Sequence, residues 1–121
     1  MTGTVTQESC DHDVNDNNGC SIEDPSAVSY GEDFATNGGG VWATQFADEG
    51  IAIWFFDRAS VPSDLSSGDS PDPSTWGTPV ANYSSEYCDI PTYFEPQHIT
   101  FTITLCGDWF VLLSILSSHL T

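Results

Sequence analysis

The pattern of apolar and polar positions predicts antiparallel strands in three parts of the chain, with strict alternation in one of them. Residues 41–47 and 51–57 are rich in β-branched and aromatic side chains, and three residues that include a glycine separate them. Two such runs joined by a short glycine-containing segment are typical of a β-hairpin. Residues 99–105 place threonine at every second position between apolar residues, which is the clearest strand pattern in the chain. The sequence therefore predicts an all-β protein.

The second strand of this hairpin is apolar on both faces. Its two faces carry Ile51, Ile53 and Phe55 on one side and Ala52, Trp54 and Phe56 on the other. Such a strand is expected inside a sheet, with other segments packed against both faces. The flanking residues 1–38 are polar and turn-rich, and residues 58–80 contain Pro, Gly, Ser and Asp at a density that predicts turns in place of regular structure. No stretch before residue 109 has a helical period.

The charge of the chain excludes two classes of partner. The 121 residues include 18 Asp or Glu, a single basic residue (Arg58) and no Lys, which gives a formal net charge of −17. Nucleic acids and anionic membrane surfaces are bound through Lys and Arg, so neither partner is expected. The longest apolar run, residues 109–116, is shorter than the ~20 residues of a membrane-spanning helix. The chain is also short for an all-β sandwich, which commonly has ~200–250 residues.

Four cysteines favour disulfides over a metal site. The chain has no C-x-x-C pair and its histidines are scattered, so neither zinc nor another cofactor is expected. An even number of cysteines in a short acidic chain predicts an oxidising compartment, although free thiols remain the alternative. Of the three possible connectivities we expect Cys10–Cys20 with Cys88–Cys106. No basic and apolar leader follows Met1, so the sequence contains no signal peptide.

Motifs for catalysis and for calcium binding are absent. The acidic residues 11–19 lack the spacing of an EF-hand, because its sixth and twelfth positions hold Asp16 and Ile22. A solvated loop between two cysteines is expected there. The chain contains no G-x-S-x-G, H-E-x-x-H or P-loop motif. His98 is expected at a strand edge, without a catalytic role.

Aromatic residues are the best candidates for ligand contacts. Tryptophan rings can stack on the apolar faces of sugars. Core packing is favoured for Trp42 and Trp54, because both lie on predicted strands. Trp76, in a turn-rich segment, and Trp109, just after a strand, are the better candidates. Residues 82–84 (Asn82-Tyr83-Ser84) form an N-glycosylation sequon, which has meaning if the chain is secreted.

A set of motifs spread over most of the chain resembles one enzyme family. The motifs are Met1-Thr2-Gly3-Thr4, Cys10, Asn18-Gly19-Cys20, Tyr30-Gly31, Gly38-Gly39-Gly40-Val41-Trp42-Ala43, Ile53-Trp54-Phe55-Phe56, Val61-Pro62-Ser63-Asp64, Trp76-Gly77-Thr78-Pro79, Cys88-Asp89-Ile90 and Leu105-Cys106-Gly107-Asp108-Trp109. In this order they closely resemble the C-terminal half of fungal laminarinase-type endo-1,3(4)-β-glucanases of glycoside hydrolase family 16. The resemblance covers about residues 1–109.

The resemblance implies a secreted, concanavalin A-like jelly roll that hydrolyses β-glucan. The family uses a retaining mechanism with two glutamates in an E-x-D-x-x-E motif, whose carboxylates lie ~5–5.5 Å apart. This chain has no such motif, because none of its glutamates has the required partners. We therefore expect an incomplete jelly roll that is inactive alone, with an extracellular location in the parent family. A non-catalytic β-glucan-binding module and a truncated gene product without function are the alternatives.

The resemblance also assigns expected contacts and boundaries. Trp109 would stack on a glucosyl ring and Asp108 would orient that ring. Trp76 is not assigned by the resemblance and stays a candidate contact because of its turn-rich segment. In the family the catalytic motif lies upstream of the segment that Met1 begins, so Met1 is expected to be an internal methionine read as a start. The apolar residues 110–121 have no counterpart in the family pattern, which indicates translated intron or frameshifted sequence. A terminal strand or helix is the alternative for this tail.

Overall fold

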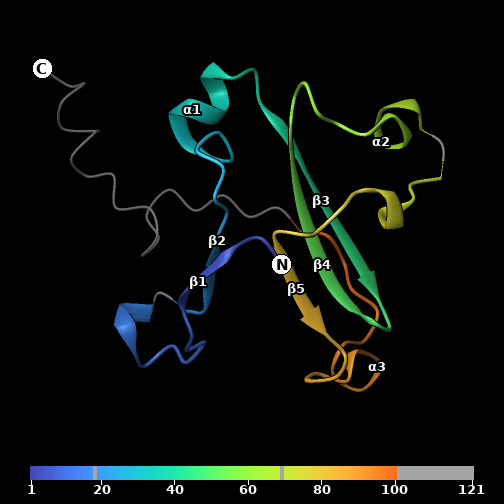
Figure 1. Cartoon of the computed structure of the whole chain (residues 1–121). Helices are drawn as coiled ribbons and strands as arrows, with labels where there is room; N and C mark the ends of the chain where they lie inside the picture. Colours follow the sequence, from blue (N-terminus) through green and yellow to red (C-terminus); the bar gives the residue numbers. More distant parts are fainter. Residues whose placement is uncertain (18, 69, 101–121) are drawn as a thin grey trace, which may run out of the picture.

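Antiparallel strands form the framework of the protein. The computed structural model describes residues 1–17, 19–68 and 70–100, and the strands there form two small sheets (Figure 1). The strands are β1 (Thr4–Gln7), β2 (Ser21–Glu23), β3 (Gly40–Ala47), β4 (Gly50–Asp57) and β5 (Ala81–Ser84). β1 pairs with β2, and the order β3–β4–β5 makes the second sheet, every pair being antiparallel. The all-β class predicted from the alternation is confirmed.

The predicted hairpin is confirmed as β3 and β4. The two strands pair over their whole length, from Gly40 with Asp57 to Ala47 with Gly50. β4 lies between β3 and β5, the interior position that its two apolar faces predict. Gly50 has a φ of +146°, and a Cβ atom there would collide with the Tyr83 carbonyl of β5. β5 can therefore approach β4 closely, because residue 50 has no side chain.

The three-stranded sheet has two unlike faces. One face, which we call the tryptophan face, carries Ala43, Ala52, Trp54, Phe56 and Asn82. The other, which we call the pocket face, carries Trp42, Phe46, Ile51, Ile53, Phe55 and Tyr83. Trp54 is only 6% exposed, whereas Trp42 and Phe46 are 47% and 51% exposed. The tryptophan face is therefore the better covered of the two.

Residues 58–80 cover the tryptophan face. The ring of Trp76 meets that of Trp54 edge to face at a centroid distance of 5.2 Å and that of Phe56 at 5.9 Å. The indole N–H of Trp54 donates to the Gly77 carbonyl at 3.1 Å. The buried hydrophobic residues of the described chain are Ala43, Trp54, Val80, Ala81 and Ile90. The core is small and centred on Trp54.

Short helices occur where only turns are predicted. They are η1 (Asn15–Asn17), α1 (Gly31–Thr36), α2 (Ser63–Ser67), η2 (Pro73–Thr75) and α3 (Ile90–Tyr93). The expectation of no regular structure in residues 58–80 is therefore wrong for α2 and η2. Local signals form these helices: Asp72 accepts from the Ser74 N–H at the start of η2, and Asp89 accepts from the Thr92 N–H at the start of α3. α2 has no side-chain cap at its start and ends at Gly68 in the left-handed conformation. Helices this short have no apolar period to detect.

The N-terminal segment ties the two sheets together. The backbone N–H groups of Thr2 and Gly3 donate to the carbonyls of Pro79 and Val80 at 2.8 and 2.9 Å, just before β5. A Cβ at Gly3 would collide with Ile22 of β2 and with the Val80 carbonyl. Figure 1 accordingly shows the N-terminus beside β5. The small sheet β1–β2 is thus held close to the larger sheet, and it lies within residues 1–38, whose sequence is polar and turn-rich.

The remaining strand prediction falls largely outside the described residues. Of residues 99–105 only Ile99 and Thr100 are described, both exposed and without strand pairing, while residues 101–105 lie outside.

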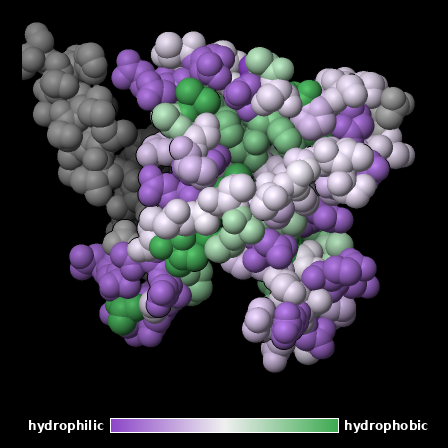
Figure 2. Space-filling view, viewed as in Figure 1, coloured by the Kyte–Doolittle hydropathy of each residue, from purple (hydrophilic) through white to green (hydrophobic). Residues whose placement is uncertain are grey.

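Green apolar surface interrupts the hydrophilic surface in the space-filling view (Figure 2). None of the helices in the described part of the chain has the length or the run of apolar residues that crossing a bilayer requires.

Candidate functional site

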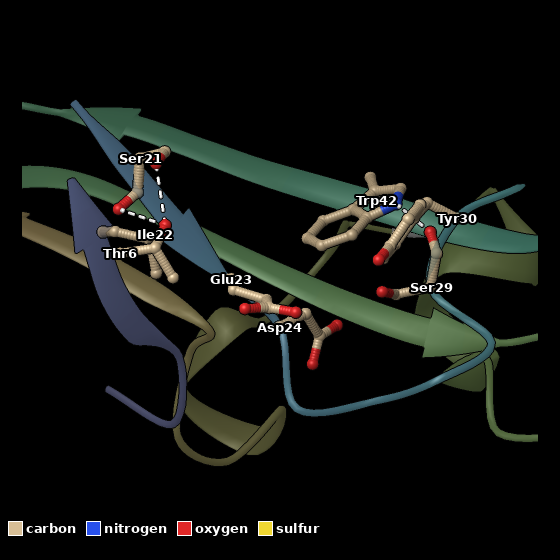
Figure 3. Close-up of a pocket in the computed structure, with 8 residues that line it drawn as sticks. All are labelled: Thr6, Ser21, Ile22, Glu23, Asp24, Ser29, Tyr30 and Trp42. Atoms are coloured by element: carbon tan, nitrogen blue, oxygen red, sulfur yellow. Dashed lines mark hydrogen bonds between the residues drawn. The ribbon is translucent and has the colours of Figure 1, made fainter. Parts of the chain in front are cut away.

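A pocket opens between the small sheet and the pocket face of the large sheet. Its volume is about 390 Å³. It is lined by Thr6, Ser21, Ile22, Glu23, Asp24, Ser29, Tyr30 and Trp42, which come from both sheets and from the segment before α1 (Figure 3). The lining combines two aromatic rings with hydroxyl and carboxyl groups. Such a combination offers stacking surface and hydrogen-bond acceptors to a polar ring such as a sugar.

Trp42 is held at the edge of this pocket by two contacts. Its indole N–H donates to the Ser29 carbonyl at 3.1 Å, and its ring lies 5.0 Å from that of Phe55. Ser29 itself is buried, and its hydroxyl donates to the Ser26 carbonyl at 2.9 Å. The expectation that Trp42 belongs to a packed core is therefore wrong for the described chain. Its ring lines the pocket together with residues of the three-residue strand β2 and is 47% exposed.

The carboxyl group of Asp24 has one satisfied and one unsatisfied oxygen. One oxygen accepts from the Ser26 N–H at 3.0 Å. Oδ2 is buried and has no hydrogen-bond partner among the described residues. A buried carboxylate oxygen favours a donor, such as a water molecule or a ligand hydroxyl. Across the pocket, Thr6 and Ser21 hydrogen-bond through their hydroxyls at 2.8 Å, which joins β1 to β2 (Figure 3).

Trp76 belongs to a different cluster, on the tryptophan face. Its indole N–H donates to the Asp64 carboxylate at 2.9 Å, and the Asp72 N–H donates to the same oxygen at 2.8 Å. Both hydrogen bonds lower the pKa of Asp64, the one from the Asp72 N–H more than the one from Trp76. A lowered pKa suits a permanent acceptor, whereas a general acid requires a raised one. The expected contact between Trp76 and substrate stays a prediction, and its N–H group is already occupied.

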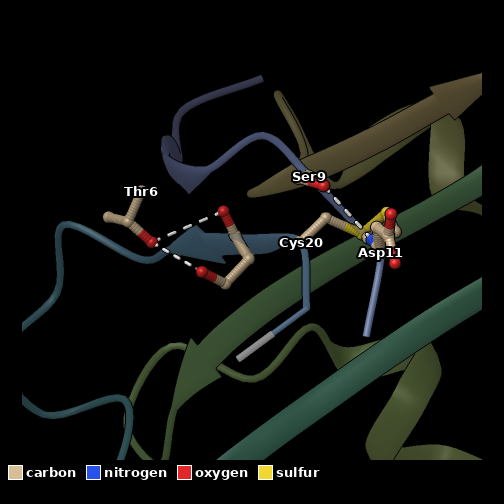
Figure 4. The surroundings of a disulfide bond; sticks show 6 residues. Thr6, Ser9, Asp11 and Cys20 are labelled. Atoms are coloured by element: carbon tan, nitrogen blue, oxygen red, sulfur yellow. Dashed lines mark hydrogen bonds between the residues drawn. A yellow bond between two sulfur atoms is a disulfide. The ribbon is translucent and has the colours of Figure 1, made fainter. Parts of the chain in front are cut away.

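The Cys10–Cys20 disulfide predicted from the sequence is confirmed (Figure 4). It closes a loop in which Asp11, His12 and Asp13 are all exposed and could hold a cation, with His12 Nε2 at 3.0 Å from Asp13. Exposed acidic groups of this kind are common without an ion, and the loop has the exposure expected of a solvated segment. Cys88 is half-buried and forms no disulfide within the described residues. Its expected partner Cys106 lies outside them, so the second pairing stays a prediction.

Two of the expected substrate contacts lie outside the described residues. These are Asp108 and Trp109. The sequon residue Asn82 is exposed on β5, and His98 is exposed near the end of the described chain. The sequence did not reveal Tyr30 or Asp24 as pocket residues, because only the fold brings them beside Trp42. The segment before Tyr30-Gly31, residues 24–29, contains Asp, Pro and Ser, and this composition is equally typical of an ordinary turn.

Comparison with known proteins gives these features a family. The chain matches the family described as XgeA-like, catalytic GH16 domain, over residues 1–118. It is 49% identical over 111 residues to the probable glycosidase C21B10.07 of Schizosaccharomyces pombe, covering 90% of this chain and 26% of that protein. It is 40% identical over 113 residues to an endo-1,3(4)-β-glucanase of Arthroderma benhamiae, covering 90% of this chain and 24% of that protein.

Solved structures agree with this family. Laminarinase 16A of Phanerochaete chrysosporium, solved with β-glucans in its donor and acceptor sites, matches with a TM-score of 0.76 and 38% identity over 98% of this chain and 41% of that chain. An elongating family 16 β-1,3-glucosyltransferase matches with a TM-score of 0.65 and 43% identity over 79% of this chain and 31% of that chain. The fold is thus the antiparallel jelly roll of the β-glucanases. The chain belongs to glycoside hydrolase family 16, and it spans about a quarter of the length of the curated relatives named above.

Proposed function

We propose that this chain forms the C-terminal part of a family 16 catalytic domain that hydrolyses β-1,3-glucans or mixed β-1,3/1,4-glucans. The observation that supports this most directly is the likeness to laminarinase 16A over nearly the whole chain, since that enzyme was solved with β-glucans bound. The Cys10–Cys20 disulfide fits an extracellular location. Within this proposal Trp109 stacks on a glucosyl ring, Asp108 orients it, and Trp76 contributes a further contact.

The chain alone is expected to be inactive. Retaining hydrolysis needs one carboxylate as nucleophile and a second as acid and base, placed ~5–5.5 Å apart. No E-x-D-x-x-E motif exists in the 121 residues. Asp64 accepts hydrogen bonds from the Asp72 N–H and the Trp76 indole N–H, which lower its pKa, whereas a general acid needs a raised one.

A complementation experiment tests this proposal. The chain is assayed for release of reducing sugar from laminarin, alone and fused behind the upstream part of laminarinase 16A, which completes the domain. We expect background activity from the chain alone and clear activity from the fusion. Hydrolysis by the unfused chain would contradict the proposal. A fusion that folds cooperatively yet stays inactive would contradict it as well, because the upstream part supplies both glutamates.

A non-catalytic β-glucan-binding module is the second candidate function. One observation favours it, namely the pocket lined by half-exposed Trp42, exposed Tyr30 and Asp24, whose buried Oδ2 has no partner among the described residues. Laminarin binding by the unfused chain, lost on Trp42→Ala and kept on Trp76→Ala, would support this candidate. Binding without a cooperative melting transition would count against it, because an unfolded apolar chain also adsorbs polysaccharide.

A further inference from the structure

The single N-x-S/T triplet of the chain, residues 82–84, lies on the face opposite the pocket. Asn82 is in the middle of β5 and pairs with Ala52 of β4. The register therefore places Asn82 on the tryptophan face, at the end that Trp76 leaves open, because Trp76 packs over Trp54 and Phe56. Its side chain is exposed.

The surroundings of Asn82 leave room for a large group. Its neighbours across the sheet are small or polar, with Ala52 beside it on β4 and Gln45 beyond on β3. The side-chain amide of Asn82 makes no hydrogen bond with the described residues, so modification would break none. By contrast, the adjacent residue Tyr83 lies on the pocket face. A glycan on Asn82 would therefore extend away from the pocket.

We propose that Asn82 carries an N-linked glycan on the tryptophan face of the β3–β4–β5 sheet. Two independent observations support this, the exposed sequon on an open part of the sheet and the Cys10–Cys20 disulfide, which fits an oxidising compartment. In the transfer, Nδ2 of Asn82 forms a bond to the anomeric carbon of a polyprenyl-diphosphate-linked oligosaccharide. The bond from that carbon to the diphosphate oxygen breaks, the diphosphate leaves with the electron pair, and the amide loses one proton.

The accessibility of the Ser84 hydroxyl determines whether the glycan is transferred before or after folding. In the folded strand Ser84 is half-buried, and its hydroxyl oxygen accepts from the Glu86 N–H at 3.2 Å. The hydroxyl at this position must be accessible when the sequon is recognised. Transfer therefore takes place on the extended chain, before β5 pairs with β4. The glycan then remains on the exposed side chain of Asn82 after folding.

The test is secretion of the full chain from yeast behind an added leader, with mass spectrometry before and after peptide N-glycosidase treatment. Chain from both cells and medium is analysed, so retention does not hide the result. We expect a glycosylated species that the enzyme converts to a chain with aspartate at position 82. Asn82→Gln and Ser84→Ala should reduce occupancy to background, whereas Ser84→Thr and the control Asn37→Gln should keep it. Unmodified wild-type chain, in a strain that glycosylates a reporter sequon, would overturn the proposal. None of these readouts depends on glucan hydrolysis.

Discussion

At the scale of single residues, the tryptophans differ mainly in what covers them. Trp54 is buried and its indole N–H is bonded to Gly77, whereas Trp42 is half-exposed and lies at the pocket. Trp76 sits between these extremes, with its ring on Trp54 and its N–H on Asp64. Their contributions to stability should therefore be unequal.

Replacing Trp54 by Ala should destabilise the fold much more than replacing Trp42. Truncating a buried tryptophan costs ~3–5 kcal/mol, since it removes packed surface and leaves a cavity. The half-exposed ring of Trp42 loses less contact, so we expect roughly half that cost for Trp42→Ala. Urea unfolding of the complemented fusion measures both. Equal losses would show that Trp42 is as firmly packed as Trp54.

The lowered pKa of Asp64 predicts how the stability of the fold depends on pH. The Asp72 N–H and the Trp76 indole lower its pKa in the folded state below the ordinary value of 3.8. The folded state therefore favours the ionised form, and its contribution to stability is present above the ordinary value and is lost as the pH falls through the lowered pKa. Asp64→Asn should flatten the dependence of the urea midpoint on pH in this acidic range. The exposed residue Asp33 on α1 supplies the control, and Asp33→Asn should leave that dependence nearly unchanged.

At the scale of elements, the glycine that begins β4 is a point where the large sheet does not tolerate a side chain. Gly50 and Gly68 both have positive φ, but a Cβ at Gly50 would meet the Tyr83 carbonyl, whereas one at Gly68 would meet open space. Gly68→Ala should cost about 1 kcal/mol from backbone strain alone. Gly50→Ala should cost more and should weaken hydrogen-exchange protection in β4 and β5. Similar losses for the two variants would mean that β5 moves aside without penalty.

The sequence predicts the elements whose signal is local and misses those that depend on distant partners. The β3–β4 hairpin is predicted because its strands are apolar, β-branched and joined by a short turn. β1 and β2 are three or four residues long and mostly polar, and they pair across a loop closed by Cys10–Cys20, so nothing in either strand reveals its partner. α2 and η2 are missed because both are too short to show an apolar period; η2 begins at the Asp72 cap, and α2 ends at Gly68 in the left-handed conformation.

The same reasoning explains how much of the candidate site could be predicted. The four cysteines allow three connectivities, and the expected Cys10–Cys20 bond is the one the structure contains; the family resemblance predicts the fold, which is also confirmed. The exposure of Trp42 could not be predicted, because a tryptophan on an apolar strand has the same pattern whether its face is covered or open. The pocket residues Asp24, Tyr30 and Trp42 come together through the packing of two sheets.

At the scale of the whole molecule, two forces act on the isolated chain in opposite directions. The pocket face exposes Trp42, Phe46 and Tyr83, and β3 is an edge strand of the described sheet. An exposed apolar face beside an open edge favours association between copies. A formal net charge of −17 opposes that association through repulsion. Salt screens the repulsion but leaves the apolar attraction in place.

The isolated chain should therefore remain dispersed at low ionic strength and associate as salt is added. At 1 M salt the screening length falls to ~3 Å, and repulsion between copies nearly vanishes. Phe46→Thr removes an exposed ring from the pocket face and should raise the salt concentration at which association begins. Tyr87→Thr is the matched control, since Tyr87 is more exposed but lies in the turn after β5, and it should leave that concentration unchanged. Light scattering across a salt series measures the onset. The same onset for both variants would mean that association does not use the pocket face. Association that decreases as salt is added would mean that charge repulsion is not what keeps the copies apart.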